Sequence, residues 1–91
     1  MLALCLLAAC GGRWPEENRE AFTRSCLATA RKTKPTASED ELVAYCECTA
    51  NHLQARYSLE EFTALEAKSV RENKPPLEIV RAAEDCGNRL R

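Results

Sequence analysis

The sequence of 91 residues has little glycine, few aromatic residues, a single histidine and almost no excess of charge. With 3 glycines and 5% aromatic residues, an all-β sandwich or barrel and a glycine-rich phosphate-binding fold are both disfavoured. The 13 Lys and Arg residues against 14 Asp and Glu residues leave a net charge of -1, so no basic stripe indicates binding to nucleic acid. A hydrolase needs a nucleophile, a base and an orienting group within reach of one another. Because the sequence has one histidine and no glycine-rich nucleophile turn, we expect no enzyme activity.

The sequence does contain six cysteines, and its proportions of hydrophobic and charged residues are those of a globular protein. Hydrophobic residues make up 45% of the chain and charged residues 30%, which is typical of a folded chain and not of a disordered one. At this length the chain forms one small domain, whose core is thin. Domains of this size usually need additional stabilisation by cross-links such as disulfides, and the cysteines can form them.

The chain begins MLALCLLAACGG, an apolar run too short to span a bilayer. Because Gly11 and Gly12 end the run, the apolar region of a signal peptide is favoured over a buried N-terminal helix. The residues Leu7-Ala8-Ala9-Cys10 resemble the lipobox of bacterial lipoproteins. Gly11 after the cysteine resembles the pattern that sorts such proteins to the outer membrane.

The lipoprotein resemblance implies an organisation in three parts. Residues 1–9 are then a signal peptide, residues 10–15 a lipidated tether, and residues 16–91 a helical domain. Cys10 would carry a diacylglyceryl group on its sulfur and an acyl chain on its amino group, and we expect no other cofactor. The protein would be anchored in the cell envelope, at the outer membrane and facing the periplasm. Trp14 would either lie in the membrane interface or cap the helices.

The sequence of residues 16–91 predicts an all-α fold, a small four-helix bundle. Two capping boxes, Ser38-Glu39-Asp40-Glu41 and Ser58-Leu59-Glu60-Glu61, mark the starts of the second and third helices. Pro15 and Pro76 suit the first turns of the first and fourth helices, and short connections favour antiparallel neighbours. The side chains expected to face the core are Phe22, Cys26, Leu27, Ala30, Leu42, Cys46, Thr49, Ala50, Leu53, Tyr57, Leu59, Phe62, Leu65, Val70, Leu77, Ile79, Val80, Ala83, Cys86 and Leu90.

Four cysteines remain for two disulfides once Cys5 and Cys10 are set aside: Cys26, Cys46, Cys48 and Cys86. A bond between Cys46 and Cys48 is disfavoured, because side chains two residues apart on a helix project to nearly opposite sides. Cys26 and Cys46 are equally far from Thr36 in the first turn, which favours the pairing Cys26–Cys46 with Cys48–Cys86. The pairing Cys26–Cys48 with Cys46–Cys86 stays open.

The segments Tyr45-Cys46-Glu47-Cys48 and Leu53-Gln54-Ala55-Arg56-Tyr57-Ser58 are similar to those of a group of small exported bacterial helical proteins. These proteins carry a Tyr-Cys-x-Cys motif, one cysteine upstream of it and one near the C-terminus. The resemblance covers the layout from about residue 20 to residue 86. It implies the helical fold and two disulfides, and it implies no activity.

Two hypotheses for function follow. The first is a lipid-anchored binding module without catalysis, with an envelope protein as partner. The alternative is a thiol redox or metal-handling protein that uses Cys46 and Cys48 with His52. Cys48 and His52 are four residues apart, a suitable ligand spacing for Cu(I) or Zn(II). Acidic neighbours such as Glu47 would raise the pKa of these thiols, which favours structural disulfides, and we expect no bound metal.

Overall fold

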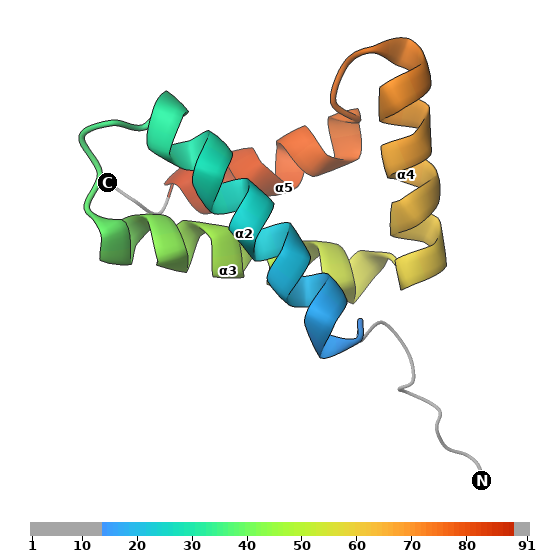
Figure 1. Ribbon diagram of the computed structural model, residues 1–91, viewed down its shortest axis with the longest axis horizontal. Helices are drawn as coiled ribbons and strands as arrows, with labels where there is room; N and C mark the ends of the chain where they lie inside the picture. The colour runs from blue at the N-terminus through green and yellow to red at the C-terminus, as the bar shows by residue number, and fades with distance from the viewer. Residues whose placement is uncertain (1–13, 89–91) are drawn as a thin grey trace, which may run out of the picture.

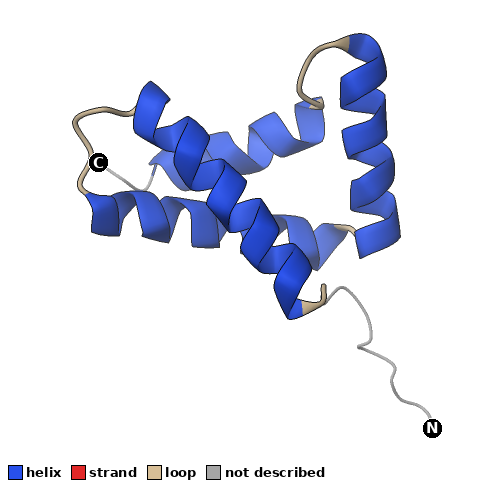
Figure 2. Cartoon of the chain, in the orientation of Figure 1, coloured by secondary structure: helices blue, strands red, loops and turns tan. Residues whose placement is uncertain are grey.

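The computed structural model describes residues 14–88, which form four helices and no strand, as Figure 2 shows. The helices are α2 (Glu16–Thr33), α3 (Glu39–Arg56), α4 (Leu59–Glu72) and α5 (Leu77–Gly87). The prediction of a small all-α bundle with two disulfides is confirmed. The predicted signal peptide, the predicted lipidation site Cys10 and the predicted core residue Leu90 lie outside the described residues.

None of the helices described in the structure combines the length and the apolar character that a membrane span requires.

Local sequence signals set the helix ends. The Ser38 hydroxyl accepts a hydrogen bond from the Glu41 amide at 3.1 Å, and the Glu41 carboxylate accepts one from the Ser38 amide at 2.8 Å. Ser58 and Glu61 make the same reciprocal pair at the start of α4. Pro15 and Pro76 are the N-cap residues of α2 and α5, so each proline directly precedes the first turn that was predicted to contain it.

The α4 helix ends at Asn73, which adopts the left-handed conformation with φ of 56°. This geometry closes the last turn, because the Asn73 amide donates to the carbonyl groups of Ser69 and Val70. Pro75 and Pro76 follow and cannot continue a helix. The chain therefore turns sharply from α4 into α5.

Helix α3 is the centre of the fold. In Figure 1, α2 crosses it on one side, α5 runs back along it, and α4 stands across the ends of α3 and α5. Both α2 and α5 pack closely against α3. The expectation of antiparallel neighbours is wrong for α4, because the sharp turns at Tyr57 and Asn73 direct this helix away from the axes of α3 and α5.

The core contains two clusters of buried residues, and α3 contributes to both. Ala30, Leu42 and Cys46 form one cluster between α2 and the first half of α3. Trp14, Leu53, Phe62 and Ala82 form the other at the far end of α3. The predicted stripe on α3 is confirmed over five positions, which are buried: Leu42, Cys46, Thr49, Ala50 and Leu53.

Trp14 is a core residue, which corrects its assignment to the tether. Its side chain is 3% exposed, and its indole Nε1 donates a hydrogen bond to the Tyr57 carbonyl at 3.1 Å. Its ring lies 4.6 Å from that of Phe62 and 6.1 Å from that of Phe22, measured between centroids. Since a buried indole cannot also lie in the membrane interface, Trp14 caps the bundle.

Two predicted core positions on the later helices are exposed. Val70 is 81% exposed and Leu77 is 58% exposed. The reason for Val70 is that α4 contacts the core through its first half, where Phe62 is the one fully buried residue of the helix. On α5, Ala82 is buried, whereas the predicted Ala83 is only half-buried.

Candidate functional site

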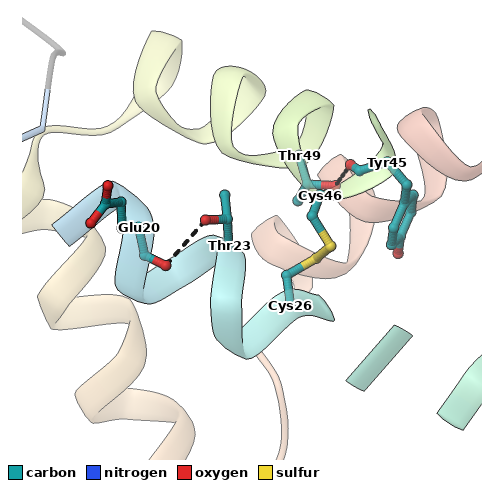
Figure 3. Close-up of a disulfide and its surroundings, with 6 residues drawn as sticks. All are labelled: Glu20, Thr23, Cys26, Tyr45, Cys46 and Thr49. Atoms are coloured by element: carbon teal, nitrogen blue, oxygen red, sulfur yellow. Dashed lines mark hydrogen bonds between the residues drawn. A yellow bond between two sulfur atoms is a disulfide. The ribbon is translucent and has the colours of Figure 1, made fainter. Parts of the chain in front are cut away.

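The structure pairs Cys26 with Cys46 and Cys48 with Cys86, the pairing favoured from the sequence. The Cα–Cα distance is 5.8 Å in each pair, as ordinary disulfide geometry requires. Figure 3 shows Cys26 on α2 and Cys46 on α3 pointing toward each other. Helix α3 is therefore bonded to α2 on one side and to α5 on the other.

The Cys26–Cys46 disulfide lies in apolar surroundings. Cys46 is 1% exposed and belongs to the cluster with Ala30 and Leu42. One turn further on, the buried Thr49 hydroxyl donates to the Tyr45 carbonyl at 2.9 Å, so this polar group is satisfied within the helix (Figure 3). These surroundings give the bond a structural role.

The Cys48–Cys86 disulfide has a histidine beside it. The sulfur atoms of Cys48 and Cys86 and a ring nitrogen of His52 all lie within 4.8 Å of one another. Cys48 and His52 are half-buried, and Cys86 is 1% exposed. This is the group of potential metal ligands found among residues 14–88.

The group differs from the predicted set in one member. The sequence hypothesis joined Cys46, Cys48 and His52, but Cys46 points toward α2 and is bonded there. Cys86 of α5 takes its place. The combined signal was present in the sequence, because Cys86 was the preferred partner of Cys48 and His52 lies one turn beyond Cys48. Cys46 and Cys48 are therefore each bonded to another helix and not to each other.

A shallow groove of about 690 Å³ runs along the face of α3 that carries Cys48 and His52. Its lining residues all come from this helix: Ala44, Glu47, Cys48, Asn51, His52, Ala55 and Arg56. A small molecule or ion can therefore reach the half-buried Cys48 sulfur and the imidazole from solvent.

A second candidate site lies where α3, α4 and α5 meet. A pocket of about 380 Å³ is lined by residues from the end of α3, the second half of α4, the α4–α5 turn and the start of α5. Tyr57, Pro75, Pro76 and the exposed Leu77 give it apolar surface. Sequence reasoning missed this pocket, because no motif marks it and α4 was expected to lie alongside its neighbours.

The lining of this pocket is predominantly cationic. It includes four basic side chains, Arg56, Lys68, Lys74 and Arg81. Only two carboxylates, Glu72 and Glu78, accompany them. Within residues 14–88 the ion pairs are Arg19–Glu47 and Arg31–Glu39, so no described carboxylate pairs with these four cations. We name this the α4–α5 pocket.

Shifted pKa values occur at groups outside the α4–α5 pocket. A hydrogen bond from Arg31 lowers the pKa of Glu39, and the same ion pair raises the pKa of Arg31. Burial raises the pKa of Tyr45, whose ring lies 5.1 Å from the Lys34 ammonium, and burial also raises the pKa of Glu66. The Arg31–Glu39 pair links the end of α2 to the start of α3 and thus supports the hairpin of these helices.

The fold and these sites define a class of protein, a small disulfide-stapled helical bundle with a cationic pocket. In comparisons with known proteins, no family model matches the chain, and neither the curated proteins nor the solved structures give a match.

Proposed function

We propose that this protein is a lipid-anchored binding module of the bacterial cell envelope, which acts without catalysis. In this proposal Cys10 carries the lipid at the outer membrane, the helical domain faces the periplasm, and the α4–α5 pocket binds an acidic segment of an envelope protein. The observation that carries the proposal is the pocket itself, whose lining combines four basic side chains and two carboxylates with apolar surface.

Two features support the export and anchoring. The residues Leu7-Ala8-Ala9-Cys10 resemble a lipobox, and paired cysteines are typical of oxidising compartments such as the periplasm. Trp14 is fixed in the core only four residues after Cys10, so the intervening chain spans at most roughly 14 Å. An anchor at Cys10 would hold the Trp14 end of the domain close to the bilayer.

The composition of the α4–α5 pocket supports binding to a protein. Arginine and tyrosine are enriched at protein interfaces, and the pocket has Arg56, Arg81 and Tyr57. The exposed Leu77 adds apolar area that a bound side chain can cover. The basic residues outnumber the acidic ones by two, which favours an acidic partner segment and disfavours a basic one.

The pocket is also held in place before any partner binds. The Cys48–Cys86 disulfide fixes α5 to α3, and the Ser58 capping box fixes the start of α4. The left-handed Asn73 and the two prolines fix the turn between α4 and α5. The α3 and α5 sides of the pocket therefore need little ordering on binding, whereas the α4 wall, which has few buried contacts, needs more.

A photocrosslinking experiment tests the pocket. A photoreactive residue at position 77 of the lipidated protein, in intact cells, is expected to crosslink to an acidic envelope protein. The matched control places the same group at Ala28, an exposed residue of α2 outside the pocket. Adding K68E and R81E should abolish the crosslink, whereas K68R should preserve it. A crosslink that survives both charge reversals would contradict binding through this pocket.

Metabolic labelling with a palmitate analogue tests the anchor separately. We expect the wild-type protein to incorporate the label and Cys10→Ser to lose it. Label that persists in Cys10→Ser, or no label in the wild type, would contradict the lipoprotein assignment while leaving the pocket proposal standing.

A further inference from the structure

We propose that the Cys48–Cys86 disulfide is a reversible lock on a metal site: when a dithiol reduces it, the two thiolates and the His52 imidazole bind one Cu(I) ion. This inference goes beyond the proposed binding function; its three ligand residues do not line the α4–α5 pocket, although the same disulfide fixes α5 to α3 there. It rests on the position of His52, which has a ring nitrogen within 4.8 Å of both sulfur atoms of this disulfide.

The fold holds these ligands together by more than the disulfide. Cys48 and His52 are one turn apart on α3, so the helix itself places them on one face. Cys86 is brought to them by α5, which packs along α3 through the buried Ala82. Reduction removes the covalent bond but leaves this packing, and the Cys26–Cys46 bond still ties α2 to α3.

The donor set favours Cu(I) over other ions. Thiolates are soft ligands that select Cu(I) and Zn(II), and an imidazole is compatible with both. Structural Zn(II) sites require four ligands, whereas Cu(I) is satisfied by two or three. The group contains three ligand residues, so it matches Cu(I) better.

Each disulfide joins one half-buried and one buried cysteine, and the two bonds differ in their surroundings. Cys48 lines the open groove on α3 together with His52, so a reductant can approach this disulfide from solvent. The Cys26–Cys46 bond lies against Ala30 and Leu42, and apolar surroundings disfavour a thiolate. We therefore expect Cys48–Cys86 to open first.

The chemical steps balance with a dithiol as reductant. One thiolate of the dithiol attacks a sulfur of the Cys48–Cys86 bond, and a mixed disulfide forms. Its second thiol then displaces the protein sulfur, so the dithiol leaves as a cyclic disulfide and both protein cysteines are reduced. Binding of Cu(I) releases the two thiol protons, and the copper keeps its oxidation state throughout.

Stepwise alkylation tests the lock on the folded protein. The lipid-free mature chain with Cys10→Ser, which keeps the four paired cysteines, is treated with limiting dithiothreitol and then with iodoacetamide, and the labelled peptides are mapped by mass spectrometry. We expect label on Cys48 and Cys86 before Cys26 and Cys46. Simultaneous labelling of all four cysteines, or earlier labelling of Cys26 and Cys46, would overturn the proposal.

An anaerobic titration with Cu(I) and a chromogenic Cu(I) chelator as competitor tests the site. Protein reduced only at Cys48–Cys86 should bind one equivalent of Cu(I), and the fully oxidised protein should bind none. His52→Ala should weaken binding by at least the roughly tenfold that loss of an outer-shell partner costs a metal site. Circular dichroism confirms that each sample keeps its helices. Tighter binding of Zn(II) than Cu(I), or unchanged Cu(I) affinity in His52→Ala, would refute the assignment.

Discussion

Helices α2, α3 and α5 are joined by covalent bonds, whereas α4 is held by side-chain packing and by its two ends. Helices α2 and α5 each contribute one cysteine to a disulfide, α3 contributes two, and α4 has none. Phe62 is the fully buried residue of α4, and its ring lies against Trp14 and Phe22. The domain thus consists of a stapled unit of three helices and a fourth helix that depends on one aromatic cluster.

The difference shows where this small domain can move. Disulfides restrict the unfolded chain, so the stapled unit stays compact even when its packing loosens. Helix α4 has few buried contacts, which is typical of segments that open locally at a lower free energy than the whole domain. Because α4 forms one wall of the α4–α5 pocket, the less stable part of the molecule is also part of the proposed binding site.

The largest expected effect is that of Phe62→Ala. Truncation of a buried phenylalanine leaves a cavity, and here it also removes two aromatic contacts, so we expect a loss of about 4–5 kcal/mol in the free energy of unfolding. Urea denaturation measures it. Hydrogen exchange should show α4 deprotected first, and Phe62→Leu should lose much less. Equal deprotection of α2 and α4 would contradict the division into two parts.

Removal of either disulfide should lower the free energy of unfolding slightly less than Phe62→Ala does, and the two disulfides should differ in their contributions. The chain-entropy relation gives about 4 kcal/mol for the 38-residue separation of Cys48 and Cys86 and about 3 kcal/mol for the 20-residue separation of Cys26 and Cys46. Thermal unfolding of the two double alanine variants measures this order. If the variant without Cys26–Cys46 were the less stable of the two, the loop-closure account would be wrong.

A smaller effect is expected at the two capping boxes, which have the same hydrogen-bond geometry. Ser38→Ala and Ser58→Ala should each lower stability by about 1 kcal/mol, because one amide loses its partner. Ser58→Ala should increase hydrogen exchange throughout α4. Ser38→Ala should not do the same in α3, because the two disulfides restrain that helix. Similar exchange in both variants would mean that the disulfides do not protect α3.

The smallest effect is expected at Val70. Its side chain is 81% exposed, so Val70→Ala should change the free energy of unfolding by less than about 0.5 kcal/mol. Urea denaturation of both variants compares Val70→Ala with Leu53→Ala, which changes a residue of α3 that is 1% exposed. Leu53→Ala should lower the free energy of unfolding by roughly 2–5 kcal/mol. A large loss at Val70 would indicate that α4 packs along its whole length.

The stapled unit was the more predictable part of the fold. The α3 stripe at helical spacing identified its five buried residues, and the position of Thr36 midway between Cys26 and Cys46 favoured the observed pairing. The capping boxes gave the starts of α3 and α4. These features depend on neighbouring residues or on one turn, so local sequence is sufficient to predict them.

The position of α4 and the burial of Trp14 were not predictable in this way. The spacing of Phe62 and Val70 is that of a helix, but it does not determine how much of the helix packs against the core. Trp14 is buried through contacts with residues more than 40 positions away, including Tyr57. The third potential ligand, Cys86, likewise depends on the packing of α5 against α3. Each of these outcomes is decided by tertiary contacts.

The docking of Trp14 has a mechanical consequence. The Trp14 amide donates to the Gln54 side chain, and its indole donates to the Tyr57 carbonyl, so the chain is fastened to the end of α3 before α2 begins. Tension applied at the N-terminus would therefore load α3 directly and bypass the first turns of α2. Since α3 is bonded to both α2 and α5, the pull would be shared by the stapled unit instead of unwinding the first helix from its end.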